Sequence, residues 1–106
     1  MPTAALDDLV PGPVEFVKVD VEGAEEAVWA GMQRLLDRSP GVIVLMEFNR
    51  ARCADPAGFL RAMANRFPLR ELRVDTRVVP VTSDHLLGRN GDVQLVLTRG
   101  SLQRRA

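Results

Sequence analysis

The stretch VKVDVEGAEEAV, at residues 17–28, alternates valines with charged side chains and then turns at a glycine. Valine-rich alternation bounded by turn residues is typical of a β-strand, so we predict a strand over residues 14–21. Gly23 tolerates the backbone conformations of a tight turn. Beyond it the apolar residues recur at helical spacing, which predicts a helix over residues 24–37.

Three ionisable side chains share one face of this strand toward its carboxyl end: Lys18, Asp20 and Glu22. The next strand, predicted over residues 41–48, is apolar almost throughout and carries Glu47 near its end. Such a strand is typical of a sheet covered on both faces. Ligands of open α/β sheets bind at the carboxyl ends of the strands. We therefore expect the carboxylates of Asp20, Glu22 and Glu47 to converge on one rim of the sheet.

The chain continues to alternate strands and helices. Asp55 followed by proline predicts the start of a helix that Pro68 ends. The later predicted elements are a strand over residues 69–75, an edge segment over 76–82, one helical turn over 83–89 and a last strand over 92–98. This order predicts a single α/β domain over residues 1–106, with a parallel βαβα start, antiparallel closing strands and three αβα layers.

The 106 residues carry a formal net charge of +0, and 46% are apolar. This balance favours neither nucleic-acid binding nor an anionic membrane as partner.

The one cysteine, Cys53, cannot form an internal disulfide, and the sequence has no CxxC pair or Cys/His cluster for zinc. The one histidine, His85, lies far along the chain, so we expect a passive thiol. No signal peptide is visible and the longest apolar run, residues 42–46, is short, so a cytoplasmic location is expected.

The charged residues of the opening stretch have other interpretations. Lys18 and Asp20 fit a structural ion pair, while Glu25 and Glu26 fit the charges that a helix macrodipole favours in its first turn. The segment VDVEG resembles the strand end that carries the phosphate-accepting aspartate of a receiver domain. The acidic pair near the first strand and the lysine at a later strand end of such a domain are missing from this sequence. The three carboxylates of the expected rim also offer the oxygen ligands of a divalent cation. We assign no metal ligand from spacing alone.

Longer segments resemble the carboxyl-terminal half of FkbM-family methyltransferases: LDDL, VEFVKVDVEGAEEAVWAGMQRLL, VIVLMEFN and the closing VVPVT and GDVQLVLTRG. The hallmark of that family is a lysine before a strand that ends in I/V-D-V/I-E-G-A-E. A helix with a glycine near its end follows, and then an apolar strand ending in glutamate. The matching residues are Lys18, Asp20, Glu22, Gly23, Ala24, Glu25, Gly31 and Glu47.

The resemblance implies a partial Rossmann-like methyltransferase sheet. It also implies S-adenosylmethionine-dependent transfer of a methyl group to a hydroxyl of a sugar, polyketide or related small-molecule acceptor. Asp20, Glu22 and Glu47 would lie beside the acceptor and the methyl donor, with Asp20 as the base or orienting group. Asp20 and Gly23 are the expected cofactor contacts. Supporting or substrate-adjacent roles are expected for Lys18, Glu25 and Asn49.

Such enzymes carry a glycine-rich cofactor loop after their first strand, and no E/D-x-G-x-G occurs in this sequence. We therefore expect strands four to seven of a seven-stranded sheet, in a fragment or one half of the enzyme. Association with an upstream-encoded amino-terminal half, or with a second copy, would complete it. The alternative is a non-catalytic remnant domain that associates through its first strand, because an unpaired strand edge attracts partners.

Overall fold

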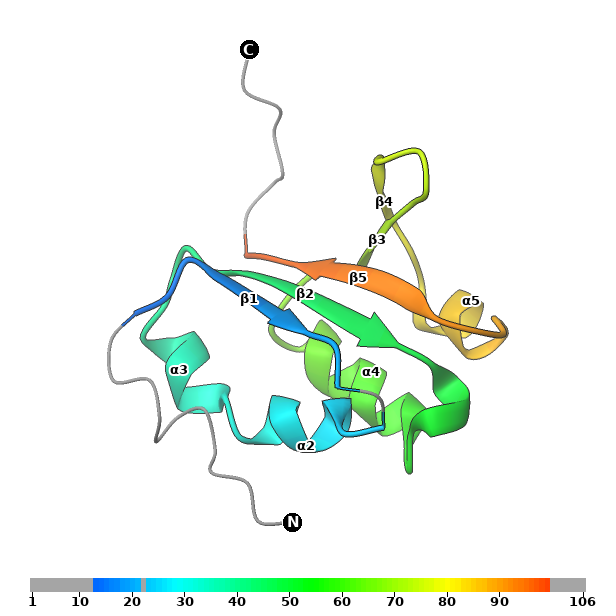
Figure 1. Ribbon diagram of the computed structural model, residues 1–106, viewed down its shortest axis with the longest axis horizontal. Helices are drawn as coiled ribbons and strands as arrows, with labels where there is room; N and C mark the ends of the chain where they lie inside the picture. The colour runs from blue at the N-terminus through cyan, green and yellow to red at the C-terminus, as the bar shows by residue number, and fades with distance from the viewer. Residues whose placement is uncertain (1–12, 22, 100–106) are drawn as a thin grey trace.

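The computed structural model describes residues 13–21 and 23–99, which form a mixed five-stranded sheet with helices packed against it (Figure 1). The strand order is β1-β2-β5-β3-β4. In chain order the elements are β1 (Phe16–Val19), α2 (Glu25–Ala30), α3 (Gln33–Asp37), β2 (Ile43–Phe48), η1 (Arg50–Arg52), α4 (Pro56–Ala64), β3 (Arg70–Leu72), β4 (Val78–Pro80), α5 (Ser83–Leu87) and β5 (Val93–Leu97).

The sheet is parallel at one end and antiparallel at the other. β1 pairs with β2 in parallel, with Lys18 beside Leu45. β5 runs antiparallel to both β2 and β3, and β4 is an antiparallel edge strand. These pairings confirm the α/β class, the parallel start and the antiparallel close. β5, the last strand among the described residues, lies in the middle of the sheet, a position that the sequence pattern did not specify.

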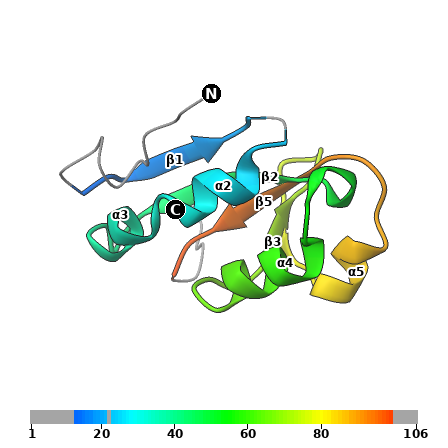
Figure 2. The same ribbon diagram turned by 90° about the horizontal axis from the view of Figure 1, so that it is seen from below.

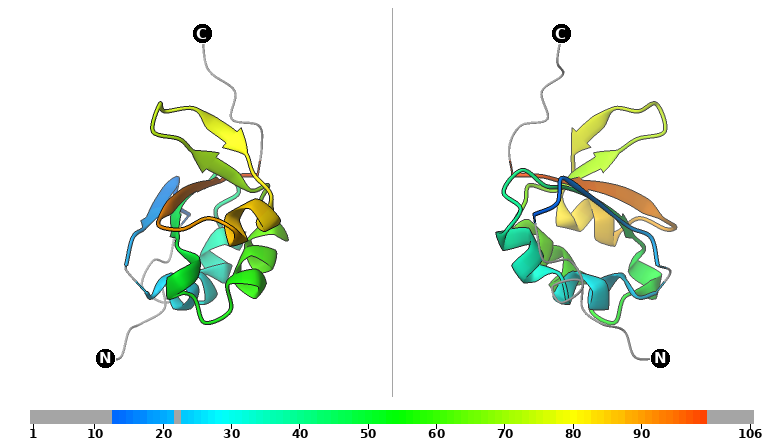
Figure 3. Two further views of the ribbon diagram at one scale, coloured as in Figure 1. Left: turned by 90° about the vertical axis from the view of Figure 1, so that its right-hand side faces the viewer. Right: turned by 60° about the vertical axis from the view of Figure 1, so that its left-hand side comes forward.

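The four α-helices lie on one face of the sheet (Figures 2 and 3). A second helical layer, as in the three-layer arrangement expected from the sequence, is not among the residues that the structure describes. The opposite face of β1 and β2 carries Phe16, Ile43 and Leu45, which alternate with the core-facing residues of the same strands. Phe16 is 58% exposed there.

The hydrophobic core lies between the sheet and its helices. Alternate residues of β2 and β5 point into it, and Met46 and Leu95 are completely buried. The ring of Trp29 in α2 meets the rings of Phe59 and Phe67 edge-on, at centroid distances of 6.5 and 6.2 Å. Edge-to-face contacts of this kind add to the stability gained by burial. They fix α2 against α4, and therefore hold the turn that precedes α2.

The single helix predicted over residues 24–37 is wrong, because the chain forms two short helices there, α2 and α3. The break falls at Gly31 and Met32. The Gly31 N–H is shared between the carbonyls of Ala27 and Val28, and the Met32 N–H bonds to Trp29, so the last turn tightens. Glycine is a poor helix former, and the break lets Met32 enter the core with no exposed surface.

The later elements follow the prediction in kind but are shorter. α4 begins as predicted, with the Asp55 carboxylate accepting a hydrogen bond from the Gly58 N–H (3.0 Å). The strand predicted over residues 69–75 ends early, because the Arg73 N–H bonds to the Arg77 carbonyl and reverses the chain into β4. β4 lies at the sheet edge, as its proline indicated.

The turn between β1 and α2 depends on one left-handed residue. Gly23 has a φ of +85° and no atom within 4 Å of where a Cβ would lie, whereas Gly41 is equally open without a positive φ. We expect Gly23→Ala to lower the free energy of unfolding by about 1 kcal/mol, because an L-residue is strained in that conformation. Gly41→Ala should be neutral or stabilising. Urea denaturation measures both, and equal values for the two variants would contradict this account.

Candidate active site

Three strands bring acidic residues to one edge of the sheet. The parallel strands β1 and β2 end side by side there, so Asp20, which follows β1, lies near Glu47 of β2. β5 runs the opposite way and begins at this edge, which adds Asp92. Glu25 completes the group from the first turn of α2. We call these four residues the acidic rim; Glu22, a further predicted site residue, lies outside the described residues.

Glu47 is the buried strand residue of the acidic rim, with only 8% of its surface exposed. Its Oε1 accepts a hydrogen bond from Arg52 Nη1 (3.2 Å), and its Oε2 accepts one from Gln94 Nε2 (3.2 Å). The same Arg52 nitrogen lies 3.2 Å from Asp92 Oδ1. One guanidinium group is therefore shared between two carboxylates.

The pKa of Glu47 is raised above its ordinary value of 4.5. Burial contributes most, because it removes water from the charged form, and the charges of Asp92, Asp20 and Glu25 add to the rise. The hydrogen bond from Gln94 acts in the opposite direction. Burial and the neighbouring acids therefore outweigh the hydrogen bond from Gln94, and the local field at Glu47 favours its protonated form.

Glu25 is buried at the rim, with 7% of its surface exposed. Its Oε1 accepts a hydrogen bond from the Gly23 N–H (3.1 Å), which holds the turn against α2. Its Oε2 is buried and has no hydrogen-bond partner within the described ranges. A buried carboxylate oxygen without a donor costs free energy. This atom is therefore suited to accept a hydrogen bond from a bound molecule.

Two other charged residues of the opening stretch lie apart from this network. Lys18 is exposed, and the structure of the described residues shows no ion pair between Lys18 and Asp20. Glu26 holds the loop before α4, because its carboxylate oxygens accept hydrogen bonds from the N–H groups of Ala54 (2.8 Å) and Asp55 (3.0 Å). Glu26 thus has a structural contact that helix-start electrostatics alone did not predict.

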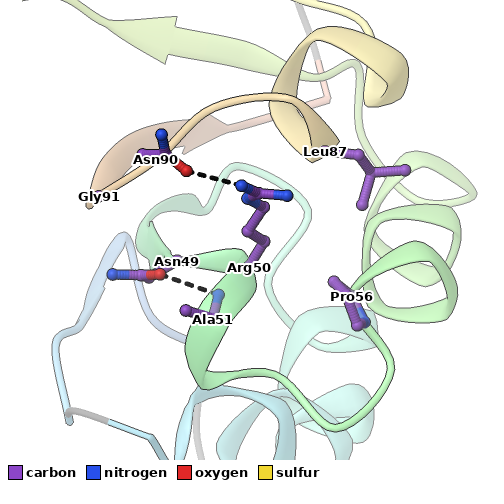
Figure 4. A pocket seen from close by; sticks show the side chains of 7 residues that line it. All are labelled: Asn49, Arg50, Ala51, Pro56, Leu87, Asn90 and Gly91. Carbon is purple, nitrogen blue, oxygen red and sulfur yellow. Dashed lines mark hydrogen bonds between the residues drawn. The ribbon is translucent and has the colours of Figure 1, made fainter.

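A pocket of about 400 Å³ lies beside the acidic rim, between η1 and the connection from α5 to β5 (Figure 4). Asn49 stands between the two: its Nδ2 donates to Asp92 Oδ1 (2.8 Å), and its Oδ1 accepts from the Ala51 N–H (2.9 Å). Arg50 Nη2 donates to Asn90 Oδ1 (2.6 Å). The Arg50–Asn90 pocket is lined by Asn49, Arg50, Ala51, Pro56, Leu87, Asn90 and Gly91.

Cys53 lies close to this region but is not poised as a nucleophile. Burial raises the pKa of its thiol to about 11, and the charges of Glu26 and Glu25 contribute to the rise. The thiol donates to the Asn49 carbonyl (3.4 Å). Since the thiolate is the reactive form, Cys53 is a poor nucleophile at neutral pH.

Over residues 13–21 and 23–99, no group of three or more His, Cys, Asp or Glu side chains is arranged to hold a metal ion. Within the same ranges, every helix is too short or too polar to cross a bilayer. The metal-site interpretation of Asp20 and Glu47 therefore gains no support from the part of the chain that is described.

Sequence reasoning missed several residues of this region. Arg52, Asp92 and the Arg50–Asn90 pair are not among the site residues that the sequence predicts. The available signal was topological. An antiparallel last strand paired with β2 has to begin at the edge where β2 ends.

The raised pKa of Glu47 makes a pH-dependent prediction. Between 4.5 and the raised value, the folded chain binds more protons than the unfolded chain, so stability falls as pH rises through that window. Glu47→Gln removes this group, so we expect wild type to lose stability relative to the variant from pH 4 upward. Urea denaturation from pH 4 to 8 measures the difference. The exposed Glu15→Gln is the matched control, and a difference that does not vary with pH would overturn the prediction.

Comparison with known proteins identifies the family. The model of the methyltransferase FkbM domain matches residues 1–72, which is 72 of the 106 residues. The match contains Asp20, Glu25 and Glu47, and it ends before β4 and β5. Searches of curated proteins and of solved structures gave no match. Because the family model covers more than half of its length, the chain belongs to the FkbM methyltransferase domain family.

Proposed function

We propose that the chain is part of an S-adenosylmethionine-dependent methyltransferase that methylates a hydroxyl group of a small molecule, such as a sugar or polyketide. The acidic rim carries this proposal. It lies at the carboxyl ends of two parallel strands, where α/β sheets bind ligands, in a chain of a methyltransferase family. A local excess of carboxylates is the environment that a cationic substrate requires.

The residues of the rim fit S-adenosylmethionine, which supplies a methyl group on a positively charged sulfonium when bound. Asp20 and Glu47 offer negative charge, and Glu25 Oε2 offers an unused acceptor to a hydroxyl or amino group. Gly23 has open space where a side chain would otherwise stand, so a ligand can approach its backbone closely. Asp20 and Gly23 are the contacts that we assign to the cofactor.

Asp20 is the group that we assign to proton removal. It is exposed, and it is not paired with Lys18, so its carboxylate can face an acceptor hydroxyl. Asp20 would take the proton as the hydroxyl oxygen bonds to the methyl carbon and the carbon–sulfur bond breaks. Glu47, held by Arg52 and Gln94, would keep the surrounding field negative. Glu22 belongs to the same group in the proposal, with Lys18 and Asn49 in support.

The proposal treats residues 1–106 as the carboxyl-terminal part of the catalytic domain. Isothermal titration calorimetry with S-adenosylhomocysteine tests it, using the chain alone and the chain mixed with the protein encoded immediately upstream. Binding in either sample supports the proposal, and binding only in the mixture indicates a split enzyme. Absence of binding in both would refute the proposed function.

The substitution Asp20→Asn removes one negative charge from the acidic rim and leaves the size of the side chain almost unchanged. S-adenosylmethionine is cationic at sulfur and S-adenosylhomocysteine is neutral there, so the variant should lose affinity for the first more than for the second. We expect a change of roughly threefold to tenfold in the ratio of the two Kd values. Calorimetry of the sample that binds measures this ratio. Asp84→Asn, an exposed aspartate in α5, is the control, and an equal loss for both ligands would contradict the assignment of Asp20.

A second candidate function is association through β1. β1 pairs only with β2 among the described strands, which leaves one of its edges open to a further strand. Beside that edge, Phe16 is 58% exposed, and Ile43 and Leu45 share its face. Open strand edges next to apolar surface favour pairing with another chain. This candidate needs no cofactor.

Phe16→Arg tests the association. If copies of the chain pair through this surface, the variant should weaken the dimer by roughly tenfold or more, because a buried aromatic side chain is replaced by a charge. Val74→Arg is the matched control, since Val74 is fully exposed in the β3–β4 turn. Sedimentation equilibrium measures both variants against wild type. A monomeric wild type, or equal weakening by the two variants, would exclude self-association through β1.

A further inference from the structure

The Arg50–Asn90 pocket presents hydrogen-bond donors and no acid. Its side-chain acceptors are both engaged: Asn90 Oδ1 accepts from Arg50 (2.6 Å), and Asn49 Oδ1 accepts from the Ala51 N–H (2.9 Å). The Asn90 amide nitrogen and the remaining guanidinium N–H groups of Arg50 are left to donate, and none of the seven lining residues is Asp or Glu. A pocket with a fixed cation and free donors suits an anion.

The other wall of the pocket is apolar. Figure 4 shows Leu87 and Pro56 on the side away from Asn49, and Arg50 stands between that side and Asn90, with its guanidinium group toward Asn90. The pocket has a volume of about 400 Å³, which is enough for a ring-sized group. The ligand that fits therefore has an anionic group next to an apolar body.

A short chain of contacts connects the pocket to the acidic rim. Asn49 lines the pocket and donates to Asp92 (2.8 Å), Asp92 lies 3.2 Å from Arg52, and Arg52 lies 3.2 Å from Glu47. Arg52 and Asn49 thereby engage the Asp92 carboxylate, which reduces its repulsion of an anion. A molecule held in the pocket would therefore lie beside the acidic rim.

We propose that the Arg50–Asn90 pocket binds a carboxylate or phosphate group on an apolar body, and that this is the non-reacting end of the methyl acceptor. The identity of the ligand as the acceptor rests on the proposed function, whereas the anion site itself does not. The pocket would hold the acceptor by its charge, while its hydroxyl group faces Asp20. Acceptors without an anionic group would be selected against.

Nuclear magnetic resonance titration of the full chain tests the site. The probes are phenyl phosphate, benzoate and the neutral benzyl alcohol, all at constant ionic strength. We expect saturable shifts of the Ala51, Asn90 and Gly91 amides with the two anions, and binding of benzyl alcohol weaker by roughly tenfold or more. Equal binding of the neutral probe, or anion shifts confined to other residues, would overturn the proposal.

Two variants identify the groups responsible. Arg50→Gln removes the cation from an exposed position and should weaken phenyl phosphate binding by on the order of tenfold to a hundredfold. Asn90→Asp keeps the size and the Arg50 contact but adds a negative charge, so it should also weaken binding. Arg61→Gln, exposed on α4 and outside the pocket, should leave the affinity unchanged. The spectra report folding of each variant, and unchanged binding by Arg50→Gln would refute the site.

The results of the two titrations, one with anions and one with S-adenosylhomocysteine, distinguish the anion site from the proposed function. Phenyl phosphate binding in the pocket, without S-adenosylhomocysteine binding to the chain or the mixture, would keep the anion site and refute the methyltransferase proposal. S-adenosylhomocysteine binding without any anion shift at Asn90 and Gly91 would do the reverse.

Discussion

The pairing of β2 with neighbours on both sides is the constraint on which the candidate site depends. On one side β1 runs parallel, which sets the end of β1 beside the end of β2. On the other side β5 runs antiparallel, which sets its start at the same edge. Asp20, Glu47 and Asp92 meet because of these two strand directions and the registers of the two pairings. A change of one residue in either register would turn Glu47 to the opposite face of the sheet.

Burying acidic side chains at this end of the strands costs free energy, and hydrogen bonds to these side chains offset part of that cost. Glu47 is buried among other acids, yet hydrogen bonds from Arg52 and Gln94 satisfy its oxygens. Glu25 retains one buried oxygen without a partner in the described chain. Groups arranged in this way stabilise a ligand better than they stabilise the empty protein, which is the pattern expected at functional sites. The neighbouring pocket has the opposite character, with Arg50 and amide donors.

The local parts of this arrangement were predictable from the sequence, and the long-range parts were not. Alternating valines, Gly23 and the helical spacing that follows determine a strand, a turn and the start of a helix over neighbouring residues, and these three features are confirmed, whereas the predicted length of the helix is wrong. The break at Gly31 was missed because periodicity continues across it. The insertion of β5 beside β2 depends on pairing between residues that η1, α4, β3, β4 and α5 separate along the chain, which no local pattern encodes. Arg52 and Asp92 were missed for the same reason, since the pairing of β5 with β2 brings them together.

The central position of β5 also sets an order of events during protein synthesis. β1 and β2 leave the ribosome first and β3 and β4 follow, but no strand pairing joins the two pairs until β5 is made. At ordinary translation rates, residues 81–97 take about one to three seconds to appear. Throughout that interval β2 and β3 each expose an unpaired edge to other nascent chains. Chain release before Leu97 would therefore leave two half-sheets, with Asp92 and the pocket wall still unplaced.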